Sequence, residues 1–149
     1  MSALDCKILC WNVRGLNAAA KRASVRNLII SSRASIVCLQ ETKISVWNDI
    51  LLKETLGPNL ANQSVFIPAT GASGGIIVAA SDRFFDLQSL SSTPHTVSAN
   101  IVSRADGTCW TISSVYGPQT EQDKINFLAE LSSLKTTVNR LGCYLVILI

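Results

Sequence analysis

The stretch Ser35-Ile36-Val37-Cys38-Leu39-Gln40-Glu41-Thr42-Lys43 decides how this chain folds. An apolar, β-branched run predicts a buried strand, and polar side chains follow directly where that strand ends. A second apolar run, Lys7-Ile8-Leu9-Cys10, leads into Trp11-Asn12 in the same way, and the residues between the two runs have apolar side chains at helical spacing. A strand, a helix and a strand in this order predict a parallel βαβ unit.

Three polar side chains each end an apolar run, and together they indicate a site. In parallel sheets ligands bind outside the carboxyl ends of the strands, so Asn12 and Glu41 are expected side by side at one edge. A carboxylate beside a carboxamide suits a hard divalent cation and the phosphate it holds. Tyr116 closes a third run, where its phenol can donate to a phosphate oxygen. Each residue alone has an ordinary explanation, as a turn former, a helix-start acid or a cap of a strand edge.

The composition limits the class of protein. A chain of 149 residues and 16.0 kDa fits one domain or part of one. Charged residues make up 15% of the chain, against about 25% in ordinary soluble domains. Either most residues of the fold are buried, or part of an apolar surface lacks the segment that would cover it. The longest apolar run, 143–149, is far below the roughly 20 residues that span a bilayer. No basic segment of a signal peptide opens the chain, so we expect an intracellular protein with no membrane partner.

The cysteines predict reduced thiols in a reducing compartment. The sequence has no Cys-x-x-Cys pair, and its single histidine cannot complete a zinc site of the usual spacing. We expect this histidine, His95, in a turn or on the surface. The five cysteines, most of them inside predicted strands, are Cys6, Cys10, Cys38, Cys109 and Cys143.

The net charge of +3 is unevenly distributed. Residues 1–43 hold seven Lys and Arg against two acids, whereas the other 106 residues hold six against eight. The basic excess therefore falls in the unit that presents Asn12 and Glu41, where it would attract a polyanion. A solvated helix face that is rich in Lys and Arg is the equally ordinary alternative.

Further elements follow from periodicity and from turn residues. Gly57-Pro58 is expected to end a short helix, Asp106-Gly107 to form a two-residue hairpin turn, and Thr120 with Asp123 to resemble a capping box. Helices are expected from about residue 47 to 54 and from about 121 to 141, and strands over 64–68, 76–80, 84–90, 97–102, 109–116 and 144–149. The last strand stops without a turn, which indicates a chain cut from a larger domain.

Four motifs in order resemble the endonuclease/exonuclease/phosphatase superfamily. They are Trp11-Asn12-Val13-Arg14-Gly15-Leu16-Asn17, Leu39-Gln40-Glu41-Thr42-Lys43, Ser73-Gly74-Gly75 and Val115-Tyr116-Gly117-Pro118. The sequences of these motifs most resemble those of the apurinic-type endonuclease domain of plant LINE-type (non-LTR) retrotransposons. The order and the spacing fit that family over essentially the whole chain.

The resemblance implies a fold, a reaction and residue roles. The fold would be α/β, a partial four-layer sandwich of two packed β-sheets with outer helices, whose C-terminal portion is missing. The reaction would be Mg²⁺-dependent hydrolysis of a phosphate ester, with Mn²⁺ as the alternative cation and DNA as the substrate class. Glu41 would bind the cation, Asn12 would position metal and phosphate, and Tyr116 would hydrogen-bond the scissile phosphate. A reverse transcriptase domain in a full-length element and a nuclear location are implied in the same way.

The chain also departs from this family. Members continue with Gly-Asp-x-Asn after the strand that here is 144–149, and then with a Ser-Asp-His segment, and this sequence holds neither. Residues 1–149 would thus form one domain, truncated before the Gly-Asp-x-Asn motif. We expect it to be inactive alone. The alternatives are a nucleic-acid-binding remnant that does not cut and a retroelement relic that barely folds.

Overall fold

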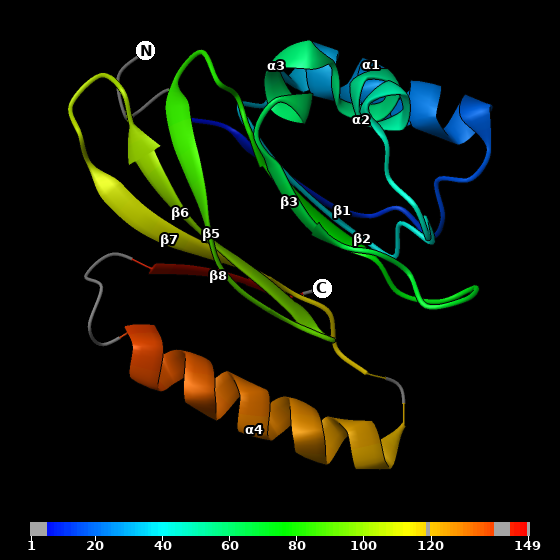
Figure 1. The fold of residues 1–149 in the computed structure, drawn as a ribbon, viewed down its shortest axis with the longest axis vertical. Helices are drawn as coiled ribbons and strands as arrows, with labels where there is room; N and C mark the ends of the chain where they lie inside the picture. The colour runs from blue at the N-terminus through cyan, green and yellow to red at the C-terminus, as the bar shows by residue number, and fades with distance from the viewer. Residues whose placement is uncertain (1–5, 119, 139–143, 149) are drawn as a thin grey trace.

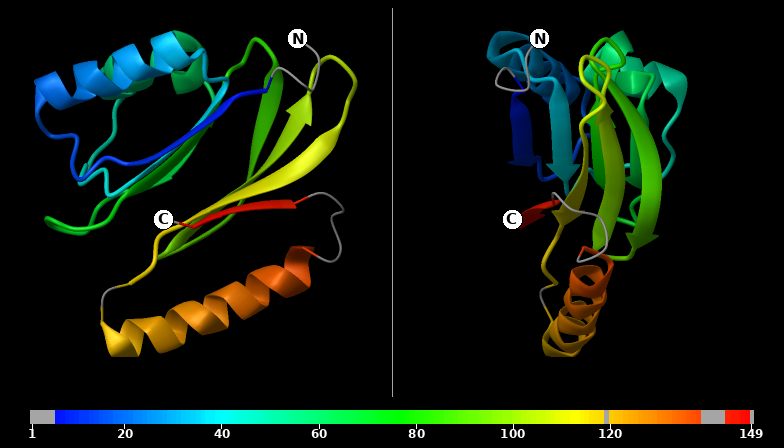
Figure 2. Two further views of the ribbon diagram at one scale, coloured as in Figure 1. Left: turned by 180° about the vertical axis from the view of Figure 1, so that it is seen from behind. Right: turned by 90° about the vertical axis from the view of Figure 1, so that its left-hand side faces the viewer.

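The computed structural model describes residues 6–118, 120–138 and 144–148 and has four layers (Figure 1). Three helices, α1 (Ala19–Ser32), α2 (Asp49–Leu56) and α3 (Pro58–Ala61), cover the outer face of a first sheet. A second sheet packs against the other face of the first, and α4 (Glu121–Val138) lies beyond it, on the side away from the other helices (Figure 2). The expected α/β fold with two packed sheets and outer helices is confirmed.

The first sheet contains the parallel βαβ unit that the opening motifs predict. Its strand order is β1-β2-β4-β3, in which β1 and β2 run parallel and pair Asn12 with Gln40, while the other pairs are antiparallel. The strands are β1 (Ile8–Asn12), β2 (Ile36–Gln40), β3 (Ser64–Ile67) and β4 (Ile76–Ala80).

The second sheet has the strand order β5-β6-β7-β8. The three strands β5 to β7 form an antiparallel meander, and β8 returns parallel to β7 after the α4 crossover. The strands are β5 (Phe85–Thr93), β6 (Thr96–Ser103), β7 (Cys109–Val115) and β8 (Tyr144–Leu148).

Strand β2 lies between the two cores, which explains its uninterrupted apolar run. Successive side chains of a strand point to opposite faces, so Val37 and Leu39 pack against the helices while Ile36 and Cys38 pack against the second sheet. All five residues of β2 are buried. A strand covered on both faces needs apolar residues at every position, and not only at alternate ones.

Gln40 is the exception within β2, because a polar side chain there enters the core between the sheets. It is fully buried, and its Nε2 donates a hydrogen bond of 2.8 Å to Oγ of Ser114 in β7. This bond joins the carboxyl end of β2 in one sheet to the carboxyl end of β7 in the other. It therefore fixes the distance between the two sheets at that edge.

Helix α2 ends at Gly57-Pro58 as expected, with Gly57 as its C-cap residue at a φ of +83°. Pro58 then occupies the first position of a further short helix, α3, where its missing N–H costs nothing.

One turn prediction needs correction. The chain at Asp106-Gly107 makes a longer loop than two residues, because Ser103 still bonds Thr108 across it. Only Gly107 of the pair has positive φ, whereas a primed two-residue turn needs positive φ at both positions.

The thiol prediction holds in part among the described cysteines, all of which are free. Cys38 is buried, Cys6 and Cys10 are half-buried, and Cys109 is exposed; Cys143 lies outside the described residues. Cys10 and Cys38 face each other in neighbouring strands. A hydrogen bond from the Cys38 thiol lowers the pKa of Cys10, while the same bond and burial raise the pKa of Cys38.

Two further expectations concern helices. Thr120 caps α4 as expected, because its Oγ1 accepts a hydrogen bond from the Asp123 N–H at 3.2 Å. The apolar residues Ile125 and Leu128 of α4 are nevertheless 62% exposed and do not form a buried face.

In the part of the chain that the structure describes, no helix has the length and apolar character needed to cross a bilayer.

Replacing Ser114 by alanine tests the bond between the sheets. The change leaves the buried Gln40 amide without its partner, so we expect the free energy of unfolding to fall by about 1–3 kcal/mol. Urea unfolding followed by circular dichroism measures it.

Ser91→Ala is the control, since Ser91 is an exposed serine of β5 and its replacement should change stability by less than about 0.5 kcal/mol. Equal effects of the two substitutions would contradict the structural role of the bond. A parent chain without any cooperative transition would support the relic interpretation instead.

Candidate metal and phosphate site

Glu41 and Tyr116 are in direct contact at the carboxyl ends of β2 and β7. The Tyr116 hydroxyl donates a hydrogen bond of 2.5 Å to Oε1 of Glu41. Glu41 directly follows Gln40, and Tyr116 lies two residues after Ser114. The bond between Tyr116 and Glu41 is therefore adjacent to the buried Gln40–Ser114 bond between the sheets. Both side chains are half-buried. The contact joins residues 75 positions apart in the sequence.

The backbone that presents Glu41 has an unusual conformation. Glu41 and Lys43 have φ of +52° and +55°, the left-handed region that non-glycine residues seldom adopt. Hydrogen bonds from both sides hold the segment: Gly15 N–H donates to the Glu41 carbonyl at 2.7 Å, and Lys43 N–H donates to the Gly74 carbonyl at 3.0 Å. Such conformations cost about 1–3 kcal/mol each and concentrate at functional sites.

Gly75 is the glycine that this arrangement requires. Its φ is +92°, and a Cβ at this position would overlap the hydroxyl of Thr42. Its carbonyl accepts a hydrogen bond of 3.1 Å from Thr42 N–H. Ser73 and Gly74 lie beside it in the β3–β4 loop, and all three residues line the cavity into which Glu41 opens. The absence of a side chain at Gly75 thus lets the β3–β4 loop pack closely against the segment that contains Glu41 and Thr42.

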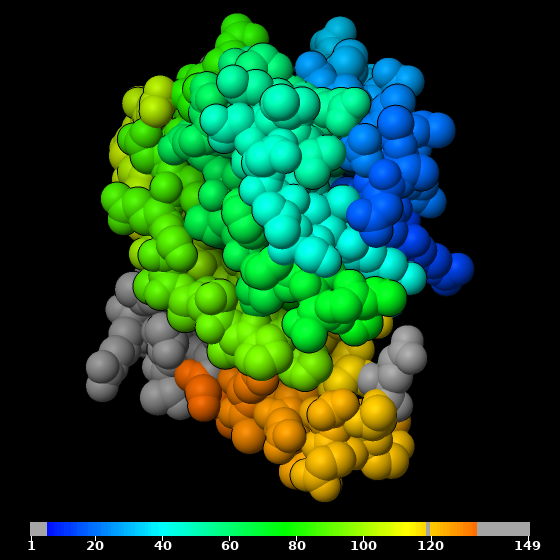
Figure 3. Space-filling model, turned by 45° about the vertical axis from the view of Figure 1, so that its right-hand side comes forward, coloured from blue at the N-terminus to red at the C-terminus, as the bar shows by residue number. Residues whose placement is uncertain are grey.

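Glu41 and Tyr116 open into one cavity of about 730 Å³. Its wall is partly polar and partly apolar and comes mainly from the β3–β4 loop, the β5–β6 turn and the start of α4, which are neighbours on one face of the molecule (Figure 3). The side chains that line it include Lys43, Ser73, His95, Thr120 and Asp123. The volume is in the range of small-molecule and substrate sites.

His95 is the lining residue whose location sequence reasoning missed. It lies in a two-residue turn between the paired residues Thr93 and Thr96, which confirms the expected turn. Its carbonyl accepts a hydrogen bond of 2.9 Å from Tyr116 N–H, and its ring is edge-on to Phe127 at 6.1 Å between centroids. The register of β5 on β6 brings it to the cavity, and the sequence around it carries no signal of that register.

Asn12 lies at the same edge of the first sheet but not in this cavity. Its Oδ1 accepts a hydrogen bond of 3.2 Å from the N–H of Arg14, a local turn contact. It lines a neighbouring cavity of about 560 Å³ with Trp11, Arg14 and Lys21. The structure thus brings Glu41 and Tyr116 together and leaves Asn12 one strand away.

The basic side chains of residues 7–43 do not form one patch. Lys43 lines the Glu41 cavity, and Arg14 and Lys21 line the neighbouring one, so these three lie at the carboxyl edge. Arg22 is neutralised, because it pairs with Glu54 at 3.0 Å and donates to two backbone carbonyls. Arg26 lies near the opposite edge of the sheet, in a cavity of its own.

The residues at the site fit a weakly held magnesium ion. No group of three or more His, Cys, Asp or Glu side chains is placed to hold a metal within residues 6–118, 120–138 and 144–148. Oε2 of Glu41 has no hydrogen bond to a described residue, whereas Oε1 accepts from Tyr116. Mg²⁺ keeps several waters and needs only one or two carboxylates together with substrate phosphates. Glu41 can supply one of these ligands.

Comparison with known proteins identifies the family. The family model described as the Endonuclease/Exonuclease/phosphatase family matches residues 9–135, a span that includes Glu41 and Tyr116. The chain belongs to this family. No curated protein matches the sequence.

Several solved structures share the fold at low sequence identity. The human Nocturnin catalytic domain has a TM-score of 0.64 and 14% identity over 96% of this chain and 62% of its own. An AP endonuclease from Archaeoglobus fulgidus gives 0.64 and 22% over 89% and 52%. The endonuclease domain of TRAS1, a telomere-specific non-LTR retrotransposon, gives 0.55 and 15% over 85% and 53%. The chain therefore spans about 52–62% of the length of these structures.

A pair of glycine substitutions tests how the Glu41 segment is held. Gly75→Ala should lower the free energy of unfolding clearly more than Gly71→Ala, because both glycines have positive φ but only a Cβ at Gly75 meets another group. In both variants an alanine at positive φ costs about 1 kcal/mol. In Gly75→Ala the overlap of the new Cβ with Thr42 adds to this cost.

Urea unfolding of the two variants measures the difference. Equal losses would show that the β3–β4 loop does not pack on the Glu41 segment as described.

Proposed function

We propose that this chain carries the cation-binding and phosphate-orienting part of a Mg²⁺-dependent phosphodiesterase, of the DNA endonuclease type found in non-LTR retrotransposons. The observation that carries the proposal is the contact between the Glu41 carboxylate and the Tyr116 hydroxyl within one cavity at the strand ends. The similarity in fold to an AP endonuclease and to a retrotransposon endonuclease domain supports DNA as the substrate class.

Each residue has a role that its geometry allows. Glu41 would hold the cation, and before substrate binds its Oε1 accepts the one hydrogen of the Tyr116 hydroxyl. When substrate enters, the Tyr116 hydroxyl would donate that hydrogen to a phosphate oxygen instead, which would leave both carboxylate oxygens of Glu41 to the cation. The cation, Mg²⁺ or Mn²⁺, supplies positive charge against the phosphate and the leaving oxygen. Asn12 borders the same edge and orients the substrate from the neighbouring cavity.

Basic side chains around these residues would hold the DNA backbone. Arg14, Lys21 and Lys43 lie at the carboxyl edge, and none of them forms an ion pair with a described residue. Lys21 lies over the Trp11 ring, 5.9 Å from its centroid. Such charges bind phosphates without reading sequence, and their contribution falls steeply with salt.

Residues 1–149 alone are proposed not to catalyse hydrolysis. The sequence contains no Gly-Asp-x-Asn and no Ser-Asp-His segment to orient water and stabilise the transition state. Groups that act as a unit lose most of their rate acceleration when several are absent. The chain is accordingly proposed as the N-terminal part of a larger domain, with a reverse transcriptase and a nuclear location in a full-length element.

Manganese binding tests the role of Glu41 without requiring activity. Mn²⁺ titration followed by electron paramagnetic resonance should give a weak site in the parent chain, and Glu41→Gln should weaken it at least tenfold, because a carboxylate ligand becomes a neutral amide. Asp86→Asn is the control, since it removes an exposed carboxylate outside the cavity. Equal weakening in both variants would contradict the assignment.

Nicking of supercoiled plasmid tests the reaction. The parent chain should not nick with Mg²⁺, whereas a fusion to a C-terminal half carrying the two missing motifs should nick and lose this activity on Glu41→Gln. Robust nicking by the 149 residues alone would overturn the proposed need for that half. DNA binding without nicking by the fusion would support a binding remnant.

A further inference from the structure

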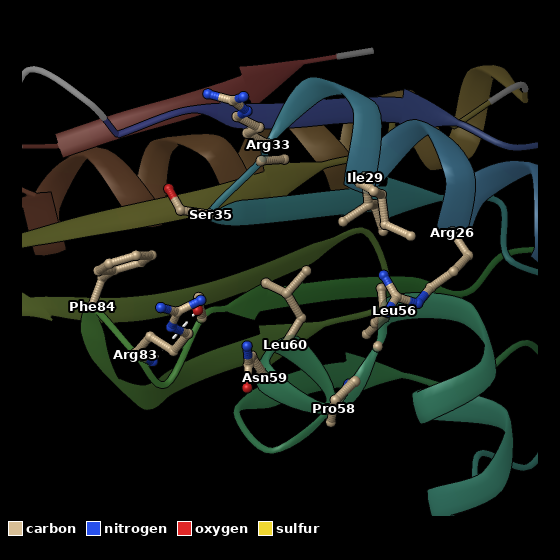
Figure 4. A pocket seen from close by; sticks show the side chains of 14 residues that line it. Arg26, Ile29, Arg33, Ser35, Leu56, Pro58, Asn59, Leu60, Arg83 and Phe84 are labelled. Carbon is tan, nitrogen blue, oxygen red and sulfur yellow. Dashed lines mark hydrogen bonds between the residues drawn. The ribbon is translucent and has the colours of Figure 1, made fainter. Parts of the chain in front are cut away.

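A second cavity lies at the edge of the first sheet opposite to Glu41. It has a volume of about 450 Å³ and lies between the end of α1, the α2–α3 junction and the β4–β5 turn (Figure 4). Ser35, which directly precedes β2, lines it, whereas Glu41 follows the end of β2. The five residues of β2 therefore lie between the two sites, and the six steps from Ser35 to Glu41 span about 20 Å at roughly 3.3 Å per residue.

The charged residues that line this cavity are all positive. Arg26, Arg33 and Arg83 belong to its wall, and no acidic side chain does. Figure 4 shows Arg26 on one side of the cavity and Arg83 on the other. The Arg33 guanidinium points away from the other two (Figure 4), so Arg26 and Arg83 supply the positive charge at the cavity, and positive charge without a counter-charge attracts anions.

Arg26 is the most informative of the three. It is half-buried, yet within the described part of the chain its guanidinium has no hydrogen bond and no ion pair. Arg22, one turn earlier on α1, shows the usual arrangement, with Glu54 and two carbonyls as partners. Gly57 makes room for Arg26, because a Cβ there would collide with the guanidinium group. A partly desolvated guanidinium without a partner is stabilised when an anion binds.

The surface between the arginines is apolar. Ile29, Leu56 and Leu60 lie between Arg26 and Arg83 (Figure 4), but at no more than 4% exposure they contribute little surface to a ligand. The accessible apolar part of the lining comes from Ala34, Pro58 and Phe84, none of which is fully buried. Phe84 borders the cavity next to Arg83, whose guanidinium lies 5.6 Å from the ring centroid. A ligand that fills this cavity would place an apolar or planar body on these side chains and anionic groups at the arginines.

We propose that this cavity binds a nucleotide. Its phosphate groups bind Arg26 and Arg83, and its base covers the apolar surface between them. The volume of the cavity is in the range of small-ligand sites. The ligand is a nucleoside phosphate, which can be a free nucleotide or the end of a nucleic-acid strand. The site is independent of the Glu41 cavity and does not depend on the function proposed for it.

Isothermal titration in EDTA at low salt tests the proposal, because EDTA removes any binding through a divalent cation at Glu41. The probes are ADP, a 5′-phosphorylated dinucleotide and inorganic phosphate. We expect saturable binding of ADP or of the dinucleotide, at least tenfold tighter than that of inorganic phosphate. Tighter binding of ADP supports a free nucleotide as the natural ligand, and tighter binding of the dinucleotide supports a strand end.

Charge-neutral variants make the test specific. Arg26→Gln and Arg83→Gln should each weaken binding at least tenfold, and the exposed Arg83 can be replaced without disturbing the core. Lys124→Gln is the control, since it removes one positive charge from α4, outside the cavity, and should change affinity less than twofold. No saturable binding to the folded parent chain, equal affinity for inorganic phosphate, or equal weakening by Lys124→Gln would each overturn the proposal.

Discussion

Two consecutive hydrogen bonds between the sheets fix the geometry of the candidate site. Gln40 bonds Ser114 in the buried space between β2 and β7, and immediately beyond it Tyr116 bonds Glu41. The first bond satisfies Nε2 of the buried Gln40 amide, whose Oε1 has no partner among the described residues. The second brings a carboxylate and a phenol from two sheets to one cavity. The site exists only while the two sheets are packed in this register.

The same edge also concentrates unfavourable backbone conformations. Glu41 and Lys43 adopt positive φ and are held by carbonyl and N–H groups of the loops at 13–16 and 74–75. The loops are therefore part of the site even where their side chains do not reach the cavity. A carboxylate presented by a constrained backbone loses less conformational freedom on binding a cation, which is the advantage of preorganisation.

The parts of the fold that follow from local rules could be predicted from the sequence. The buried runs of β2 and β4, the helix between β1 and β2 and the strand-end positions of Asn12, Glu41 and Tyr116 all follow from periodicity and from the geometry of parallel strands. Asn12 differs from the other two residues in its contacts. Its amide accepts a local hydrogen bond from Arg14, whereas the contact between Glu41 and Tyr116 is not local, because it depends on how two sheets pack.

Other features lay beyond local reasoning for the same reason. The approach of His95 to Tyr116 depends on strand register, and the arginine-lined cavity depends on how α1, α3 and the β4–β5 turn meet. The charge count indicated a basic βαβ unit, but only the packing separates the charges at the Glu41 edge from Arg26 at the other. Pro58 begins α3 because the preceding glycine turns the chain, which composition alone does not specify.

A double-mutant cycle between Glu41→Gln and Tyr116→Phe, measured as free energies of unfolding in urea, tests the convergence of these two side chains most directly. If the carboxylate and the phenol are bonded as described, the effects of the single substitutions will not add, and the coupling will be at least about 0.5 kcal/mol. Additive effects, equal to the double mutant within about 0.3 kcal/mol, would show that the two residues do not share a site and would contradict the account.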